Sequence, residues 1–228
     1  MIVRVEISVE SVAGVRVAVA AGADRAELCG GSAVGGLTPS RGLVEAAVAA
    51  AGGIEVHVLV RPRPGDFCYT ADELGVIERD IGVARECGVA GVVVGALDGD
   101  GELAVPFLGA AQGMQTTLHR ASDVCADSRR TLDRAIEAGF TRVLTSGRER
   151  SVLDGAPLIR ELVERAAGRI QVMACGGVRA DNARRVLAAT GVEDLHAAPR
   201  RPVRGAGGLF GDHDETDPDA VAALCGIR

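Results

Sequence analysis

The chain has 228 residues, of which 47% are hydrophobic and only 2% aromatic, and its net charge is −6. This length and composition predict a single domain with a core of small, branched side chains. A negative chain without a basic stripe is a poor partner for nucleic acid. No apolar run approaches the roughly 20 residues that cross a membrane. The first residues are typical of a strand rather than a signal peptide, so we expect a cytoplasmic protein.

Two residue types limit the chemistry. Six cysteines are scattered at positions 29, 68, 87, 125, 175 and 225, without the C-x-x-C spacing of a zinc ribbon or a thioredoxin-like motif. In a cytosolic protein we expect them to be reduced thiols. The chain contains no lysine, since all 25 basic residues are arginine. This excludes every mechanism that needs a lysine Schiff base.

Short apolar or alternating runs recur along the chain, and each is followed by a helical pattern. We expect strands at residues 2–8, 25–29, 54–61, 91–97, 114–120, 142–146, 170–175 and 192–196. Strands that alternate with helices predict a parallel sheet, and eight such units favour a (β/α)8 TIM-type barrel in the α/β class. The early G-x-G-x-x-G fingerprint of an open, dinucleotide-binding sheet is missing.

The repeating pattern stops after His196. We expect residues 1–198 to form the barrel and residues 199–228 to form a C-terminal extension packed on the same domain. Within this extension, residues 199–217 are rich in Gly, Arg, Pro and Asp, which predicts an exposed loop. A short helix over residues 218–224 is expected to close the chain.

The stretch over residues 54–69 holds the most unusual chemistry. Val56 and Val58 fall on one face of the expected strand and Glu55 and His57 on the other. Two prolines then end the strand, because proline cannot donate to a sheet ladder. The turn that follows contains three groups that we expect to lie over the barrel mouth: Asp66, Cys68 and Tyr69.

The same alternation occurs in other expected strands and predicts which side chains enter the barrel. The helix-facing side of each strand has to be apolar, so the polar parity is expected to face the lumen. These polar sets are Arg4, Glu6 and Ser8; Arg25, Glu27 and Cys29; and Gln115, Thr117 and His119. A charged lumen requires extensive pairing, because an unpaired buried charge costs on the order of 3–5 kcal/mol.

Reactive groups of a parallel barrel belong at the C-terminal ends of its strands. There we expect a set of acid and base groups whose pKa values are shifted by a shared, desolvated pocket. The candidates are Glu6, Glu27, His57, His119 and Asp123. The alternative is that such charges form structural ion pairs. This interpretation is favoured for Arg4, Arg25 and Glu55, which stand near the beginning of their expected strands.

A second group at the strand ends suits an anion. Arg61 and Arg120 can make paired contacts to a carboxylate or phosphate. Gly176 and Gly177 precede a helix after the seventh strand, as in barrel phosphate sites, and Ser146 follows the sixth strand. The alternative is that the two glycines are only turn residues. Together these residues predict a small anionic ligand bearing a phosphate or carboxylate.

Cysteines near the strand ends permit a soft metal such as Cu(I), which prefers sulfur ligands. No close spacing of cysteines supports such a site, and isolated cysteines often serve as small buried apolar residues. From the residues alone, a copper site and simple burial of the thiols both stay open.

Five segments together resemble the copper homeostasis protein CutC family. They are GADRAELC at 22–29, GGLTPS at 35–40, RPRPGDFCY at 61–69, HRASD at 119–123 and RVLTSG at 142–147. The likeness runs in order over residues 2 to about 198 and so covers most of the chain. Two small departures occur, Pro64 in place of glycine and Ser122 in place of an aromatic residue.

This resemblance implies a TIM-type barrel, a cytoplasmic protein that forms homo-oligomers, and a role in copper handling. In the family, the copper proposal rests on cysteines at the ends of the first two strands. Here the second is kept as Cys29, but the first is replaced by Ser8, whose hydroxyl is a poor ligand for Cu(I). Two hypotheses follow: a copper-associated binding protein with Cys29 as a metal ligand, or an acid/base enzyme that acts on a small anionic metabolite.

Overall fold

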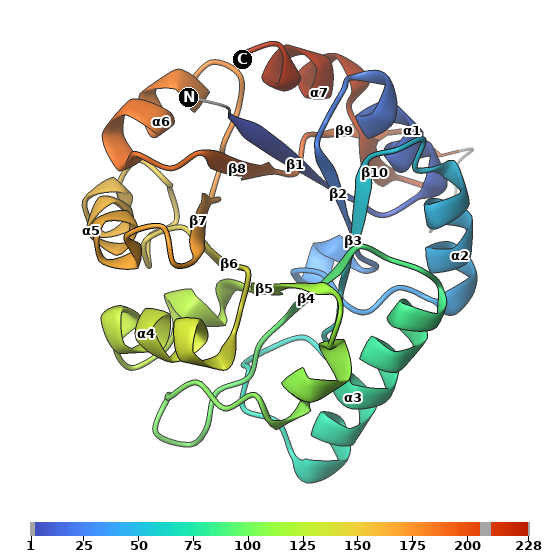
Figure 1. Ribbon diagram of the computed structural model, residues 1–228. Coiled ribbons are helices and arrows are strands. Elements are labelled where there is room, and N and C mark those ends of the chain that lie inside the picture. The colour runs from blue at the N-terminus through green and yellow to red at the C-terminus, as the bar shows by residue number, and fades with distance from the viewer. Residues whose placement is uncertain (1–2, 206–210, 228) are drawn as a thin grey trace.

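The computed structural model describes residues 3–205 and 211–227. Eight parallel strands close into a barrel in the order β1 to β8, and helices surround it on the outside (Figure 1). This confirms the predicted (β/α)8 barrel. The strands are β1 (Arg4–Val9), β2 (Arg25–Leu28), β3 (Glu55–Leu59), β4 (Gly91–Val94), β5 (Gln115–Leu118), β6 (Arg142–Thr145), β7 (Gln171–Ala174) and β8 (Asp194–Ala197).

The helices begin and end where local signals predict. In α3 the side chain of Thr70 accepts from the N–H of Glu73 while the Glu73 carboxylate accepts from the N–H of Thr70, which is a capping box. Asp127 caps α4, and Gly139 ends it in the left-handed conformation that glycine tolerates best. The outer helices are α1 (Val12–Ala20), α2 (Arg41–Ala50), α3 (Ala71–Glu86), α4 (Ser128–Ala138), α5 (Ala156–Ala166), α6 (Ala183–Thr190) and α7 (Pro218–Cys225).

Three short 3-10 helices lie in the connections: η1 (Ser32–Val34), η2 (Pro106–Ala111) and η3 (Arg120–Asp123). The fourth unit departs from the predicted strand-helix alternation, because η2 is the only helix between β4 and β5 in this fully described segment. No helix of the described residues is both long and apolar enough to cross a membrane.

The core lies between the barrel and its helices, and strand parity sets it. Val5 and Ile7 of β1 face outward and are fully buried, whereas Glu6 between them is buried inside the barrel. The predicted inward direction of the polar sets is thus confirmed for Glu6, Arg25 and Glu27. Arg4 was expected in the lumen but is exposed, because it is the first residue of β1 and lies at the open N-terminal end of the barrel.

The segment after β8 differs from the exposed loop expected over residues 199–217. It contains β9 (Arg200–Val203) and β10 (His213–Thr216), which pair as an antiparallel sheet; residues 206–210 lie outside the described residues. Arg201 on β9 and Glu215 on β10 pair across the sheet at 2.5 Å. Charged residues replace the apolar alternation of a strand here, so the sequence pattern could not reveal it. Helix α7 then packs against α1 and β1.

Candidate functional site

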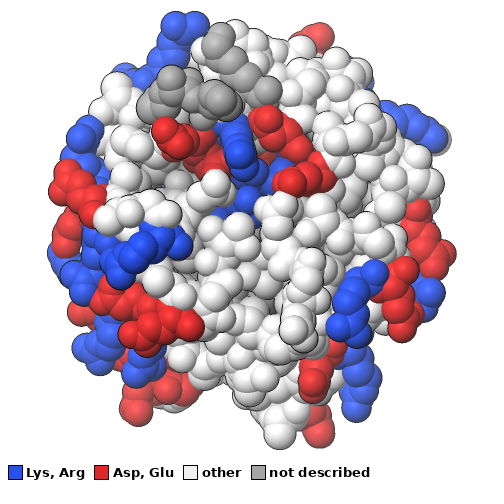
Figure 2. All heavy atoms as spheres, in the orientation of Figure 1, with Lys and Arg blue, Asp and Glu red and all other residues white. Residues whose placement is uncertain are grey.

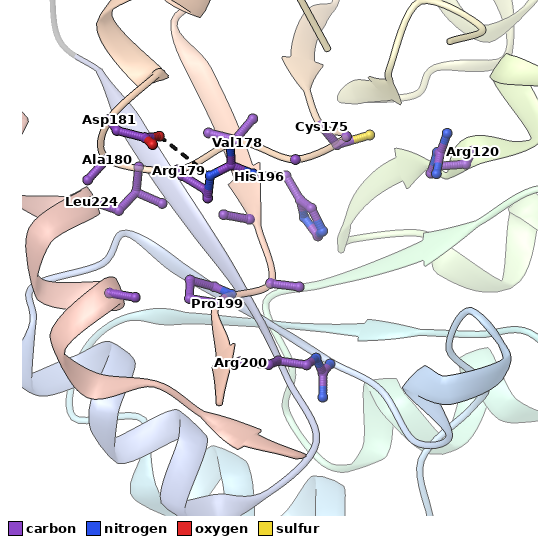
Figure 3. A pocket seen from close by; sticks show the side chains of 15 residues that line it. Arg120, Cys175, Val178, Arg179, Ala180, Asp181, His196, Pro199, Arg200 and Leu224 are labelled. Carbon is purple, nitrogen blue, oxygen red and sulfur yellow. Dashed lines mark ion pairs between the residues drawn. The ribbon is translucent and has the colours of Figure 1, made fainter. Parts of the chain in front are cut away.

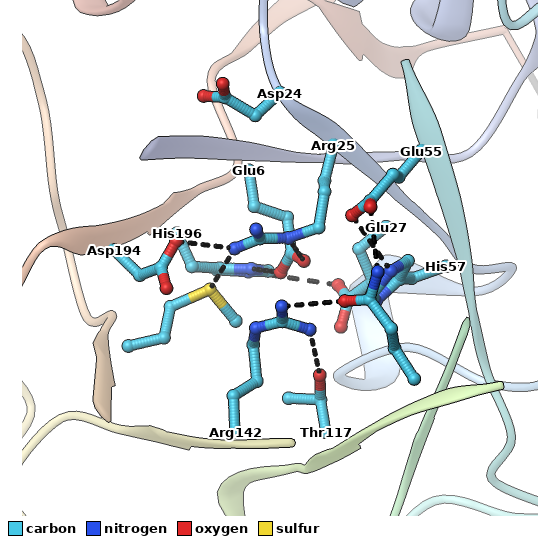
Figure 4. A network of polar contacts seen from close by, with 12 residues as sticks. Glu6, Asp24, Arg25, Glu27, Glu55, His57, Thr117, Arg142, Asp194 and His196 are labelled. Carbon is cyan, nitrogen blue, oxygen red and sulfur yellow. Dashed lines mark hydrogen bonds and ion pairs between the residues drawn. The ribbon is translucent and has the colours of Figure 1, made fainter. Parts of the chain in front are cut away.

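The lower part of the barrel lumen, nearer the N-terminal ends of the strands, is filled by a charged layer instead of the usual aliphatic side chains (Figure 4). Arg25 is fully buried and lies between two carboxylates, with its Nε 3.1 Å from Glu6 Oε2 and its Nη2 2.8 Å from Asp194 Oδ1. Arg142 donates to Gln115 Oε1 at 2.8 Å and to Thr117 Oγ1 at 3.3 Å. This layer forms structural ion pairs. On the outer surface, acidic and basic side chains also gather near the centre of the view in Figure 2.

His57 belongs to this lower layer. Its Nε2 lies 3.6 Å from Glu55 Oε2, and its ring packs on Gly91, where an added Cβ would lie 2.8 Å from the ring. The close approach of His57, aided by the hydrogen bond from Gln115, lowers the pKa of Glu55 to about 2 although burial opposes this. His57 lines neither of the two cavities at the barrel mouth.

Above the charged layer, His196 joins two carboxylates. Its Nδ1 is hydrogen-bonded to Glu6 Oε1 at 2.8 Å, and its Nε2 lies 3.8 Å from Glu27 Oε2. Burial alone would lower the pKa of His196, but the charges of Glu27 and Glu6 outweigh it and raise that pKa. Burial raises the pKa of Glu27, and attraction to His196 offsets this only in part. The protonation of either group therefore depends on the charge of the other.

Glu6 has the opposite electrostatic balance. Burial disfavours its charge, but the hydrogen bond with His196 and the charge of Arg25 hold its pKa below the usual range. Ligand atoms of Glu6, Glu27 and His196 lie within 4.8 Å of one another, as in a metal site. Both oxygens of Glu6 are already engaged, however, one by Arg25 and one by His196.

Two cavities open at the C-terminal ends of the strands. The inner pocket has a volume of about 250 Å³ and is lined, among others, by Ser8, Glu27, Cys29, Arg61, Phe67, His119 and His196. The outer cavity has a volume of about 670 Å³ and lies over β7 and β8 (Figure 3); it is lined, among others, by Cys175, Gly176, Gly177, Arg179 and Pro199. Arg120, His196, Ala198 and Arg200 line both cavities, so these form one continuous mouth.

Backbone N–H groups are available in the outer cavity. Gly176 and Gly177 have positive φ values of 102° and 80°, and their N–H groups have no hydrogen-bond partner within the described part of the chain. An added Cβ on Gly176 would lie 2.9 Å from the Cβ of Ser146, so this glycine is required for packing. Free N–H groups on a turn of this kind can bind an anion.

Asp123 accepts hydrogen bonds from several directions and organises the ends of β5 and β6. Its Oδ1 accepts from Thr145 Oγ1 at 2.6 Å and from the N–H of Arg148 at 3.2 Å. Its Oδ2 accepts from Arg120 Nε at 2.8 Å and from the N–H of Ser146 at 3.1 Å. With both oxygens occupied, Asp123 is arranged to orient Arg120 and Ser146 rather than to exchange a proton with a ligand.

Arg61 is a buried cation whose hydrogen bonds go to carbonyl groups and not to a carboxylate. Its Nη1 donates to Gly36 O at 3.0 Å and to Val34 O at 3.3 Å, and its Nη2 donates to Gly65 O at 2.9 Å. The buried Nε has no hydrogen-bond partner among the described residues. The guanidinium carbon lies 5.1 Å from the centre of the Phe67 ring, which suits a cation–π contact.

His119 is held neutral in the same wall. Burial and the nearby charge of Arg61 lower its pKa to about 3. Its Nδ1 accepts from the N–H of Ala121 at 3.2 Å, and its buried Nε2 has no partner. The ring lies 4.5 Å from the ring of Phe67, centre to centre.

The turn over residues 61–69 reaches the inner pocket through Phe67. We expected Asp66, Cys68 and Tyr69 to line the mouth, but they line neither described cavity. Arg63 holds them to one side, because it donates to Asp66 Oδ1 at 3.0 Å and to Cys68 O at 2.7 Å and lies 5.0 Å from the centre of the Tyr69 ring.

The thiols do not form a cluster. Cys29 Sγ lies 3.7 Å from Ser8 Oγ at the end of β2, and burial with the nearby charge of Glu27 raises its pKa to about 12. Cys175 is buried on the other side of the mouth, and burial raises its pKa too. Among the described residues, the group of three metal-ligating side chains that lie close enough to share an ion contains no cysteine.

Three pocket residues were not predicted as part of the site. His196 stands at the end of β8, so its position indicated the mouth but not its contact with Glu6. Phe67 lies in the same turn as Asp66, Cys68 and Tyr69, and the sequence led us to predict those three residues instead. Arg200 contacts the inner pocket and forms an ion pair with Glu10, although its segment was expected to be a loop.

The comparisons with known proteins agree with the resemblance read from the five sequence segments. A CutC family protein from Agrobacterium fabrum is 46% identical over 197 residues, which cover 85% of this chain and 78% of the relative. Another from Caulobacter vibrioides is 45% identical over 208 residues, which cover 90% of this chain and 84% of the relative.

A solved structure from Streptococcus agalactiae, named as a candidate copper homeostasis protein CutC, is 33% identical with a TM-score of 0.81 and covers 86% of this chain and 98% of its own. A thiamine phosphate pyrophosphorylase from Pyrococcus furiosus is only 17% identical, has a TM-score of 0.59, covers 99% of this chain and 95% of its own, and shares the fold alone. The family model described as "CutC family" matches residues 3–200, and the chain therefore belongs to the CutC family.

Proposed function

We propose that this protein takes part in copper homeostasis, the role carried in the name of its relative from Streptococcus agalactiae. Family membership supports this role, and the thiol of Cys29 in the inner pocket supports that pocket as the place of binding. Sulfur ligands select Cu(I), whereas the hydroxyl of Ser8 is a far weaker ligand. Copper held by one sulfur is expected to bind less tightly than copper at a two-thiolate site.

Equilibrium dialysis against a Cu(I) chelator tests this proposal. We expect Cys29→Ala to lose the copper that the wild-type protein retains. Cys68→Ala is the matched control, because the Cys68 thiol is exposed and lies outside both cavities. Full copper stoichiometry in Cys29→Ala would rule out binding at this position.

A second candidate function is acid/base chemistry on a small anionic metabolite. The observation that favours it is the position of Glu27 beside His196 in the pocket, with Glu27 Oε2 3.8 Å from His196 Nε2. Burial raises the pKa of the Glu27 carboxyl, so it is a stronger base than an exposed glutamate and acts nearer to neutral pH. Glu6 fixes the orientation of His196 from the opposite side of the ring.

The anionic part of such a metabolite would bind in the outer cavity. Arg120 lines it and is half-exposed, and the free N–H groups of Gly176 and Gly177 lie on its wall. A phosphate bound there would receive one charged donor and two backbone donors, which is a strong combination for an oxyanion.

Binding of inorganic phosphate, measured by calorimetry, tests the second candidate. We expect Arg120→Gln to weaken phosphate binding about tenfold or more, which corresponds to about 1.4 kcal/mol. Arg79→Gln is the control, since Arg79 is an exposed residue of α3. Equal phosphate affinity in wild type and Arg120→Gln would count against the outer cavity as the anion site.

We also propose that the protein is cytoplasmic and forms homo-oligomers. Cys29, Cys68, Cys87, Cys125 and Cys175 are free thiols, which fits a reducing compartment. Analytical ultracentrifugation of the purified protein over a range of concentrations tests the assembly, and a monomer at all concentrations would contradict it.

A further inference from the structure

We propose that Arg61 and His119 form an oxyanion recess in the inner pocket, which receives a carbonyl, enolate or carboxylate oxygen of the ligand. The oxyanion recess is defined by two N–H groups, Arg61 Nε–H and His119 Nε2–H. The inference rests on the second candidate function and names the chemical group that its ligand presents. It assigns this ligand a carbonyl or carboxylate in the inner pocket, apart from any phosphate in the outer cavity.

The first support is the charge of Arg61. The guanidinium is buried, and its two terminal nitrogens donate to the carbonyl oxygens of Val34, Gly36 and Gly65. These bonds fix the group but leave its charge without an acidic partner among the described residues. A buried charge without a counterion is unfavourable unless a ligand supplies one. Three of the five N–H donors of the guanidinium are used in this way, and Nε–H has no acceptor among the described residues.

The second support is the tautomer of His119. The N–H of Ala121 donates to Nδ1 at 3.2 Å, so Nδ1 has no hydrogen. A neutral imidazole with an unprotonated Nδ1 must carry its hydrogen on Nε2. His119 therefore presents one fixed N–H donor, and this donor is buried without a partner. The ring is suited to donate a hydrogen bond and not to accept a proton.

The two donors belong to one wall. Phe67 contacts both groups, with the Arg61 guanidinium 5.1 Å and the His119 ring 4.5 Å from its ring centre. All three residues line the inner pocket, which Glu27 also lines. Glu27 is on β2 and His119 follows β5, three strands further around the closed barrel. The residues that line the pocket thus include two with unpartnered N–H donors and one with a carboxylate.

This arrangement suits the removal of a proton from the carbon next to a carbonyl group. The Glu27 carboxylate takes the proton, the electron pair of the C–H bond forms the C=C bond of an enolate, and the carbonyl π electrons move to the oxygen. That oxygen lies in the oxyanion recess, where preorganised donors stabilise its charge. Glu27 then returns the same proton to a different carbon of a conjugated enolate, so the reaction is an isomerisation and consumes no other reactant.

Binding of oxalate, a small dicarboxylate that resembles the enolate of a 2-keto acid, tests the oxyanion recess. We expect calorimetry to show oxalate binding to the wild-type protein, at least about tenfold weaker binding to His119→Phe and to Arg61→Met, and unchanged binding to Arg79→Gln. His119→Gln keeps an N–H donor and is expected to bind within about threefold of wild type. Thermal melts identify any variant that has lost its fold.

Nitrogen-15 NMR of the histidine rings supplies a measurement that packing alone would not change. We expect His119 to stay in the Nε2–H form from pH 5 to pH 8 and its Nε2 signal to shift when oxalate binds. A hydrogen on Nδ1 of His119, or an Nε2 signal that does not shift when oxalate binds, would overturn the proposal.

The outcomes separate this inference from the function on which it rests. If oxalate binds His119→Phe and Arg61→Met as tightly as wild type while phosphate still requires Arg120, the oxyanion recess is wrong and the second candidate function stands. If neither oxalate nor phosphate binds the wild-type protein, both fail together.

Discussion

His196 Nδ1 lies 2.8 Å from Glu6 Oε1, and this contact links the two levels of the barrel interior. The other oxygen of Glu6 accepts from Arg25 Nε at 3.1 Å. One carboxylate therefore completes the charged layer that fills the lower lumen and also orients the imidazole at the mouth. Stability and chemistry depend on the same side chain.

Replacement of this carboxylate tests the link. Glu6→Gln leaves the buried Arg25 and the partly buried His196 with one charged partner fewer each, and we expect a loss of about 3–5 kcal/mol in the free energy of unfolding. The pKa of His196 is expected to fall, because Glu6 is one of the charges that raise it. Urea denaturation and histidine NMR measure the two effects.

Glu27→Gln is the matched control for this change. Glu27 also raises the pKa of His196, but no hydrogen bond joins it to Arg25. We expect the same direction of change in the pKa of His196 with a much smaller loss of stability. Equal stability of Glu6→Gln and wild type would show that the charged layer does not need this carboxylate.

His119 predicts a specific dependence of stability on pH. Its pKa falls from 6.5 in the unfolded chain to about 3 in the folded protein, because of burial and the charge of Arg61. Below pH 6.5 the unfolded chain therefore binds a proton at His119, whereas the folded protein binds it only near pH 3. The stability contributed by a neutral His119 is complete above pH 6.5 and is lost as the pH falls toward 3, by about 1.4 kcal/mol per pH unit.

The measurement compares urea unfolding of wild type and His119→Gln between pH 6 and pH 4, where the variant should lack this slope. His196 acts in the opposite sense, since its folded pKa is raised and its contribution is lost as the pH increases through that value. His196→Gln should therefore change the slope of unfolding free energy against pH only on the alkaline side. A parallel pH profile for wild type and His119→Gln would mean that His119 titrates normally.

Strand parity explains how far the sequence could predict this protein. The alternation in β1 and β2 placed Glu6, Arg25 and Glu27 inside the barrel, and the eight repeated units gave its topology. A one-dimensional pattern gives only the face on which a side chain lies. It could not place His57 below the mouth, because the depth of a residue depends on how neighbouring strands are staggered around the barrel.

Loop residues were harder to predict than strand residues, for a related reason. Arg63 contacts Asp66, Cys68 and Tyr69 and draws them away from the pocket, and nothing in the spacing of these residues encodes that arrangement. The partners of Arg61 are carbonyl oxygens, which every residue has, so its hydrogen bonds carry no sequence signal. The antiparallel strands β9 and β10 escaped prediction because their sequences, RRPV and HDET, lack the alternation of apolar and polar residues that marks a strand.

Asp123 gives a prediction that connects stability with anion binding. Its carboxylate accepts from Thr145, Ser146, Arg148 and Arg120, and charged hydrogen bonds contribute more than neutral ones. We expect Asp123→Ala to cost about 3 kcal/mol or more, since several buried donors lose their acceptor at once. Phosphate affinity should also fall, because Arg120 loses the group that orients it.

Thr145→Val is the control, since it removes one donor to Asp123 and leaves Arg120 in place. We expect a cost of about 1 kcal/mol and little change in phosphate affinity. Calorimetric titration with phosphate and denaturation in urea provide the comparison. An Asp123→Ala protein that binds phosphate normally would contradict the positioning role of Asp123.

Ser8→Cys tests whether the end of β1 limits copper binding. The hydroxyl oxygen of Ser8 lies 3.7 Å from Cys29 Sγ, so the substitution would place a second thiol beside the first. Two sulfur ligands suit Cu(I) much better than one, and we expect the affinity to rise by at least about tenfold, or about 1.4 kcal/mol. Competition with a Cu(I) chelator measures the change. The double variant Ser8→Cys with Cys29→Ala, which keeps one thiol, should lose this gain.

The copper affinity of Ser8→Cys should also depend strongly on pH. Burial and the charge of Glu27 raise the pKa of Cys29 to about 12, so each thiol must release a proton when it binds the metal. For two such thiols the affinity is expected to fall about a hundredfold for each unit of decreasing pH, and about tenfold for the single thiol of wild type. A Ser8→Cys protein with wild-type affinity at every pH would show that copper does not bind between these two strands.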